Sequence, residues 1–92
     1  MKLDLTGKTT LVTGSDRNTG EIIAGSLAHS GASVIFHGNE CDGSAALAAK
    51  AVPGACSIEG DVATQEGCDS LIEQLKALGV SVDILVNNYG TA

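Results

Sequence analysis

The most informative stretch of this sequence is Thr13-Gly14-Ser15-Asp16-Arg17-Asn18-Thr19-Gly20. It follows a short β-forming run, residues 9–13, and it opens a helical pattern. A strand that turns through glycine into a helix presents unpaired backbone N–H groups and the positive end of the helix dipole. We therefore expect this turn to bind phosphate through the N–H groups of Asn18, Thr19 and Gly20. Glu21 stands where the phosphate-binding loop of nucleotide triphosphatases requires lysine, so that class is excluded.

Strands and helices alternate along the rest of the chain. Apolar runs predict strands over residues 9–13, 33–37, 55–59 and 83–87. Between them, the apolar spacing predicts helices over residues 19–30 and 42–51, and a third that Thr64 caps and Gly79 ends. The strand starts are too far apart for hairpins and suit right-handed βαβ crossovers. The sequence thus predicts an α/β fold, a Rossmann-like doubly wound parallel sheet in one domain.

Composition narrows the range of partners. The net charge is −6, with five basic residues among 92, so we expect no nucleic-acid partner. No signal peptide, apolar span or basic amphipathic helix is recognisable, and we expect no membrane association. Three cysteines without CxxC spacing indicate reduced thiols and a cytoplasmic location. His29, His37 and Cys41 lack the spacing of a metal site or an activated nucleophile, so we expect no metal.

Three motifs in order make the chain resemble the short-chain dehydrogenase/reductase family over its whole length. The turn at residues 13–20 resembles that family's T-G-x-x-x-G-x-G fingerprint, with Asn18 in place of the middle glycine. Asparagine tolerates a left-handed backbone best among residues with side chains. Asp61-Val62 resembles the aspartate motif after the third strand, and residues 87–90, Asn-Asn-Tyr-Gly, resemble N-N-A-G after the fourth. The resemblance implies the strand order 3-2-1-4 and a dinucleotide cofactor, NADP or NAD.

The resemblance also implies which residues contact the cofactor. The turn would hold the diphosphate, Asp61 would accept from the adenine amino group, and the Val62 N–H would serve a ring nitrogen. The backbone from Asn88 to Gly90 would line the adenosine ribose, where Tyr89 replaces the usual alanine. For the Asn87 side chain the sequence leaves two roles open, one at the cofactor site and one that only holds the end of the strand. The expected cofactor-binding residues are Gly14, Ser15, Arg17, Asn18, Thr19, Gly20, Gly38, Asn39, Asp61, Val62, Asn88, Tyr89 and Gly90.

The choice between NADP and NAD depends on charge near the second strand. Arg17 stands where NADP-preferring relatives carry a basic residue, and its planar fork suits a 2′-phosphate. Gly38 and Asn39 occupy the positions where NAD-preferring relatives place an acid. Asp16 could nevertheless pair with Arg17 and bring a negative charge close. On balance the sequence favours NADP.

No catalytic residue is recognisable in these 92 residues. The family's catalytic serine and Tyr-x-x-x-Lys pair lie beyond the asparagine motif, and Tyr89 has no lysine after it. The resemblance implies an oxidoreductase that transfers hydride between the nicotinamide and a carbonyl or alcohol substrate, here represented by its cofactor-binding portion, residues 1–92. The alternative is a truncated, inactive nucleotide-binding or interaction module. The apolar strand at residues 84–86 further predicts a homo-oligomer or a place within a larger chain.

Overall fold

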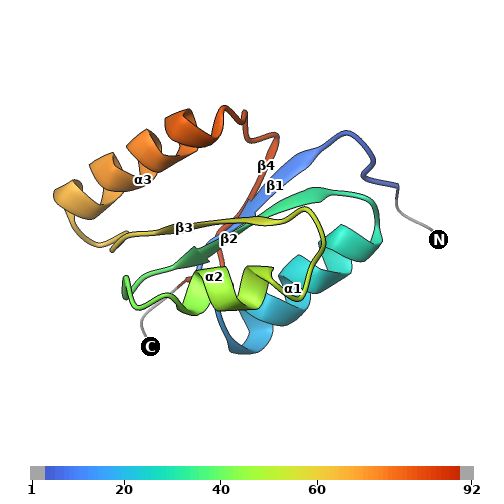
Figure 1. Ribbon diagram of the computed structural model, residues 1–92, viewed down its shortest axis with the longest axis horizontal. Helices are drawn as coiled ribbons and strands as arrows, with labels where there is room; N and C mark the ends of the chain where they lie inside the picture. The colour runs from blue at the N-terminus through green and yellow to red at the C-terminus, as the bar shows by residue number, and fades with distance from the viewer. Residues whose placement is uncertain (1–3, 90–92) are drawn as a thin grey trace.

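The computed structural model describes residues 4–89. Its elements follow one another in strict alternation (Figure 1). They are β1 (Thr9–Val12), α1 (Asn18–His29), β2 (Ser33–Gly38), α2 (Ser44–Ala49), β3 (Cys56–Glu59), α3 (Gln65–Leu78) and β4 (Ile84–Val86).

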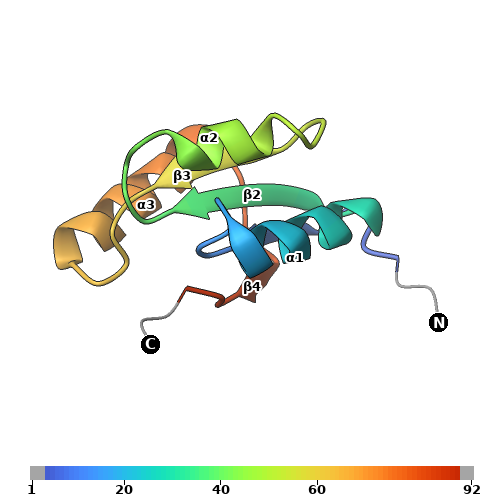
Figure 2. The same cartoon turned by 90° about the horizontal axis from the view of Figure 1, so that it is seen from below.

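The four strands form one parallel sheet in the order β3-β2-β1-β4, which confirms the predicted topology. In the register, Thr10 lies beside Val34 and Val12 beside Phe36. On the other side of β1, Leu11 lies beside Leu85 of β4. All strands therefore end at the same edge, where ligands of doubly wound sheets bind. Helices α1 and α2 cover one face and α3 lies on the opposite side (Figures 1 and 2).

The core lies between the sheet and the pair α1 and α2. Val12, Val34 and Phe36 point to this face and are each at most 3% exposed. The helices meet them with alanines, Ala24 and Ala45, both fully buried. Because alanine is small, the helix backbones can approach the sheet closely, and this brings the start of α1 against the end of β1.

The opposite face is covered much less. No residue of α3 is buried, and Leu85 in β4 is 61% exposed. Strand β4 carries apolar side chains on both sides, and within residues 4–89 no element covers the side that carries Leu85. Among the same residues, no helix has the length and apolar character needed to cross a membrane.

Both ends of α3 follow local signals, whereas α2 departs from its predicted length. The Thr64 side chain accepts the Gly67 N–H at 3.0 Å, and Gly79 ends α3 in the left-handed conformation at φ 69°, as predicted. Helix α2 is shorter than the predicted 42–51. Gly43 precedes it in a left-handed turn at φ 84°, and after Ala49 the backbone bonds shift to the tighter i to i−3 pattern.

A buried hydroxyl provides a test of the sheet's packing. Thr10 is fully buried, and its Oγ1 has no hydrogen-bond partner among the described residues. An unpaired buried polar group costs about 1–3 kcal/mol. We therefore expect Thr10→Val, which keeps the shape, to raise the free energy of unfolding by about 1 kcal/mol in urea denaturation. Thr10→Ala is the control and should lower it, because it leaves a cavity. A loss of stability in Thr10→Val would show that the hydroxyl has a partner.

Candidate functional site

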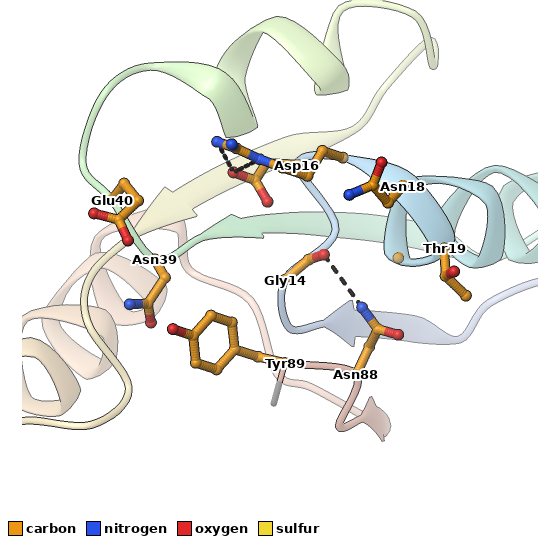
Figure 3. A pocket seen from close by; sticks show the side chains of 10 residues that line it. Gly14, Asp16, Asn18, Thr19, Asn39, Glu40, Asn88 and Tyr89 are labelled. Carbon is orange, nitrogen blue, oxygen red and sulfur yellow. Dashed lines mark hydrogen bonds and ion pairs between the residues drawn. The ribbon is translucent and has the colours of Figure 1, made fainter. Parts of the chain in front are cut away.

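A cleft of about 460 Å³ opens at the carboxyl edge of the sheet, above the ends of β1, β2 and β4 (Figure 3). This volume lies within the usual range of small-molecule sites. Its lining residues come from the turn after β1, from the end of β2 and from the end of β4. They are Gly14, Asp16, Arg17, Asn18, Thr19, Gly20, Asn39, Glu40, Asn88 and Tyr89.

The first turn of α1 forms one wall of the cleft. Its N-cap is Arg17, whose side chain does not cap the helix. The first backbone hydrogen bond of the helix runs from the Glu21 N–H to the Arg17 carbonyl. Within residues 4–89, no protein group accepts from the N–H of Asn18, Thr19 or Gly20. Asn18 has φ 55°, which confirms the left-handed backbone predicted for it. These free donors at a helix N-terminus can bind an anion.

The turn and the helix approach each other too closely for side chains. A Cβ at Gly20 would overlap the Gly14 carbonyl and stand 2.6 Å from the Asn88 Nδ2. Gly14 itself has φ 64°, and a Cβ there would lie 3.2 Å from Tyr89. Both glycines are therefore required by the space around them, and Gly14 also by its backbone conformation.

The buried imidazole of His37, in β2, holds the turn after β1 in place through a hydrogen bond. The Gly14 N–H donates to its Nδ1 at 2.9 Å, so the ring proton is on Nε2, which lies 2.9 Å from the Gly60 carbonyl. Ser15 reinforces this link, because its N–H donates to the His37 carbonyl and its Oγ accepts the His37 N–H, each at 2.9 Å. His37 and Ser15 are both fully buried.

A threonine hydroxyl joins β1 to the segment after β4. The Oγ1 of Thr13 accepts the N–H of Asn88 at 3.0 Å and that of Tyr89 at 3.1 Å. The Asn88 amide then donates to the Gly14 carbonyl at 3.2 Å, as Figure 3 shows. Asn88 thus holds the floor of the cleft, and Tyr89 extends across it toward Asn39 (Figure 3).

An ion pair between Arg17 and Asp16 lies at the end of the cleft nearest α2. Arg17 pairs with Asp16 at 3.0 Å and lies 3.7 Å from Asp42. The hydrogen bond that Arg17 donates to Asp16, together with the negative charge of Asp16, raises the pKa of the Arg17 guanidinium above its ordinary value. Asp16 also accepts the Ser44 hydroxyl at 2.6 Å, and its Oδ2 lies 3.3 Å from where a Gly38 Cβ would stand. The carboxylate that the sequence lacks at Gly38 is thus supplied in space by Asp16.

The loop after β3 lies behind Asn39. The Asn39 amide donates to the Asp61 Oδ1 at 3.1 Å, and its carbonyl accepts the Val62 N–H at 2.9 Å. Asp61 is held independently by the Ala63 N–H at 2.8 Å. Asn39 lines the cleft, whereas Asp61 and Val62 do not.

The structure brings most of the predicted residues together. Eight of them line the cleft: Gly14, Arg17, Asn18, Thr19, Gly20, Asn39, Asn88 and Tyr89. Gly38 is buried beside Asp16, and Ser15 supports the turn from inside rather than facing the cleft. Gly90 lies outside the described residues.

The expected cofactor-binding set omits four contributors, Asp16, Glu40, Thr13 and His37, although the pairing of Asp16 with Arg17 was expected and is observed. The first two line the cleft, and the other two hold its walls. A histidine within an apolar strand is the one signal that could have indicated a buried hydrogen-bonding role for His37.

Residues 4–89 contain no cluster of three or more His, Cys, Asp or Glu side chains that could hold a metal ion. Cys41, Cys56 and Cys68 are all free thiols.

Comparison with known proteins gives one consistent result. The profile of the short chain dehydrogenase family matches residues 8–92. An uncharacterized oxidoreductase of Bacillus subtilis is 42% identical over 98% of this chain, and the sorbitol dehydrogenase of Cereibacter sphaeroides is 40% identical over 96%. This chain spans 34% of the length of each of these relatives.

Two solved structures have the same fold as this chain. The Pseudomonas aeruginosa RhlG/NADP active-site complex superposes with a TM-score of 0.84 at 33% identity, over 99% of this chain and 38% of that one. A gluconate 5-dehydrogenase from Burkholderia cenocepacia, in complex with NADP and tartrate, gives 0.85 at 31% identity, over 97% and 36%.

The close approach of α1 to the turn after β1 can be tested by substitution of two glycines in α1. A Cβ at Gly20 would overlap the Gly14 carbonyl, whereas a Cβ at Gly25 would meet nothing within 4 Å. We expect Gly20→Ala to lower the free energy of unfolding by about 1–3 kcal/mol through overpacking. Gly25→Ala is the matched control and should raise it by about 0.5–1 kcal/mol, because alanine favours the helix. Equal effects of the two variants in denaturant titrations would contradict the geometry of the turn.

Proposed function

This chain belongs to the short-chain dehydrogenase family, and on that premise we propose that it is the cofactor-binding portion of an NADP-dependent oxidoreductase. The bound cofactor would supply hydride transfer, to or from a carbonyl or alcohol substrate. One observation carries the proposal: the free N–H groups of Asn18, Thr19 and Gly20 open into a cleft at the carboxyl edge of a parallel sheet.

The cofactor's diphosphate fits the first turn of α1. Phosphate oxygens accept hydrogen bonds and carry negative charge, which the N–H donors and the helix dipole both favour. Gly14 and Gly20 both line the cleft, and because neither has a Cβ, the turn, the start of α1 and the segment after β4 can pack closely beneath a ligand. The protein's net charge of −6 acts on a ligand from longer range and is screened by salt. The N–H donors act at hydrogen-bond distance, so the net charge does not prevent this binding.

The adenosine end would lie toward Asn39, Asp61 and Tyr89. The Asp61 carboxylate is an acceptor and the Val62 N–H is a donor, and together they match the amino group and N1 of adenine. The backbone at Asn88 and Tyr89, fixed by Thr13, would line the adenosine ribose. Tyr89 offers an aromatic surface in the same cleft.

The preference for NADP rests on Arg17. Within residues 4–89, it is the only cationic side chain that lines the cleft, and its side chain is 56% exposed. A 2′-phosphate on the ribose near Gly38 would share the guanidinium with Asp16. Two of the family members of known structure bind NADP, which supports the same choice.

The NADP preference predicts a charge-dependent difference in affinity. We expect NADP to bind more tightly than NAD, and its affinity to fall more steeply between low and high salt, because the 2′-phosphate contact is ionic. Arg17→Gln should weaken NADP by roughly tenfold and leave NAD nearly unchanged. Isothermal titration calorimetry at two salt concentrations measures all of these affinities.

The control for this prediction is Lys50→Gln, which removes an equal charge from an exposed position at the end of α2. It should affect both cofactors alike and only slightly. Tighter binding of NAD than of NADP to the unmodified chain would reject the preference, whereas failure of both cofactors to bind would reject the proposed function.

The acid–base residues of the reaction lie outside these 92 residues in our proposal. Tyr89 is the only tyrosine, and no lysine follows it. We therefore expect a purified polypeptide of these residues to bind the cofactor without turning over sugar alcohols or ketones. An assay of cofactor absorbance at 340 nm with saturating substrate checks this, and sustained turnover that survives Tyr89→Phe would contradict the assignment of the catalytic residues to another part of the protein.

A further inference from the structure

We propose that the side chain of Asn39 occupies the adenine-recognition pair of this chain, and that the cofactor's adenine must displace it in order to bind. The proposal rests on the function proposed above and concerns only how the adenine end is recognised. It makes Asn39 a residue that sets affinity and selectivity for the base.

The first argument is the geometry of the contact. The Asn39 amide donates to the Asp61 Oδ1 at 3.1 Å, and its carbonyl accepts the Val62 N–H at 2.9 Å. In the side chain, this donor and acceptor are bonded to one planar carbon. Adenine presents the same arrangement, because its amino nitrogen and N1 are both bonded to C6. The Asn39 carboxamide thus makes the two hydrogen bonds that the adenine edge would make.

The second argument is that the recognition pair exists without Asn39. The Ala63 N–H donates to the same Asp61 oxygen at 2.8 Å, and the Thr64 N–H donates to the Asp61 carbonyl at 3.3 Å. These bonds come from the start of α3 and hold the carboxylate beside the Val62 N–H. Removal of the Asn39 side chain would therefore expose a formed donor–acceptor pair.

The third argument is the position of Asn39 at the boundary of the cleft. Asn39 lines the cleft, but Asp61 and Val62 behind it do not. Figure 3 places Asn39 at the end of the cleft toward which Tyr89 points. Glu40 also lines the cleft, on the same side as Asn39 (Figure 3), and its carboxylate offers an acceptor for the amide once it is released. Displacement consequently extends the cleft to the base-recognition pair.

The test uses two mononucleotides that differ only at the base edge. Adenosine 5′-monophosphate presents a donor and an acceptor in the order that Asp61 and Val62 require. Inosine 5′-monophosphate presents them in reverse order, with an acceptor at O6 and a donor at N1. We expect Asn39→Ala to tighten binding of the adenosine nucleotide by roughly threefold to tenfold, since a closed state that competes with the ligand is removed. Binding of the inosine nucleotide should remain weak and unchanged.

A measurement on the unmodified chain removes dependence on the variant's folding. In ¹⁵N-resolved NMR, the side-chain NH₂ signals of Asn39 should move to positions typical of a solvated amide when adenosine 5′-monophosphate saturates the chain. The Val62 amide should retain a hydrogen-bonded shift, because one acceptor replaces another. Asn39→Ser is the second variant and should behave as Asn39→Ala does.

Three results would overturn the proposal. The first is weaker or unchanged binding of the adenosine nucleotide by Asn39→Ala. The second is an equal gain for the inosine nucleotide, which would indicate relief of steric hindrance alone. The third is an Asn39 NH₂ signal that stays in place at saturation. In each case the function proposed above would stand if NADP still binds, whereas loss of binding by all adenine nucleotides, with the unmodified chain folded, would reject that function instead.

Discussion

The buried ring of His37 is the constraint on which the cleft depends. One rigid imidazole receives the Gly14 N–H on one nitrogen and contacts the Gly60 carbonyl with the other, each at 2.9 Å. It thereby fixes the distance between the turn after β1 and the loop after β3. Because Gly14 must donate to Nδ1, the ring is in its neutral Nε2–H form in this arrangement. Loss of either contact would leave a polar group without a partner at the edge of the core.

The strand ends satisfy one another's polar groups and leave selected donors available. Thr13 collects the N–H groups of Asn88 and Tyr89, and Asn88 bonds back to Gly14. After these bonds are made, the first turn of α1 still has unpaired donors that face the cleft. The anion site is therefore what remains when the scaffold has completed its own hydrogen bonds. Such an arrangement would let an acidic protein hold a phosphate with few basic side chains, as the proposed function requires.

Much of the fold was predictable because its signals are local. The cap at Thr64, the left-handed Gly79 and the positive φ of Asn18 each depend on a few neighbouring residues. The order of the strands followed from family resemblance. The length of α2 was overestimated, because alanine-rich sequence favours helix while the turn at Gly43 and the tight bonds after Ala49 shorten it.

The site was predictable only where a motif names its own residues. The turn and the asparagine motif identified seven of the eight predicted lining residues, and Asn39 was expected from its position after the second strand, yet the bonds that hold the cleft join positions more than 20 residues apart. Periodicity carries no information about such pairs. Asp16 shows the same limit: beside Gly38 it supplies a carboxylate that no residue at the end of β2 provides, and the sequence indicated only its pairing with Arg17.

Two kinds of binding group, one lining the cleft and one behind Asn39, differ in what satisfies them without a ligand. The N–H groups of Asn18 and Thr19 are exposed, so water can satisfy them at little cost. The Val62 N–H is partly buried beside a carboxylate and needs a partner of defined geometry. Asn39 is such a partner, since its amide matches both groups at once. A partly buried recognition pair thus favours a side chain that makes the same hydrogen bonds as the ligand. The affinity for the ligand then depends on the difference in free energy between the bonds that the ligand makes and those that the Asn39 side chain makes.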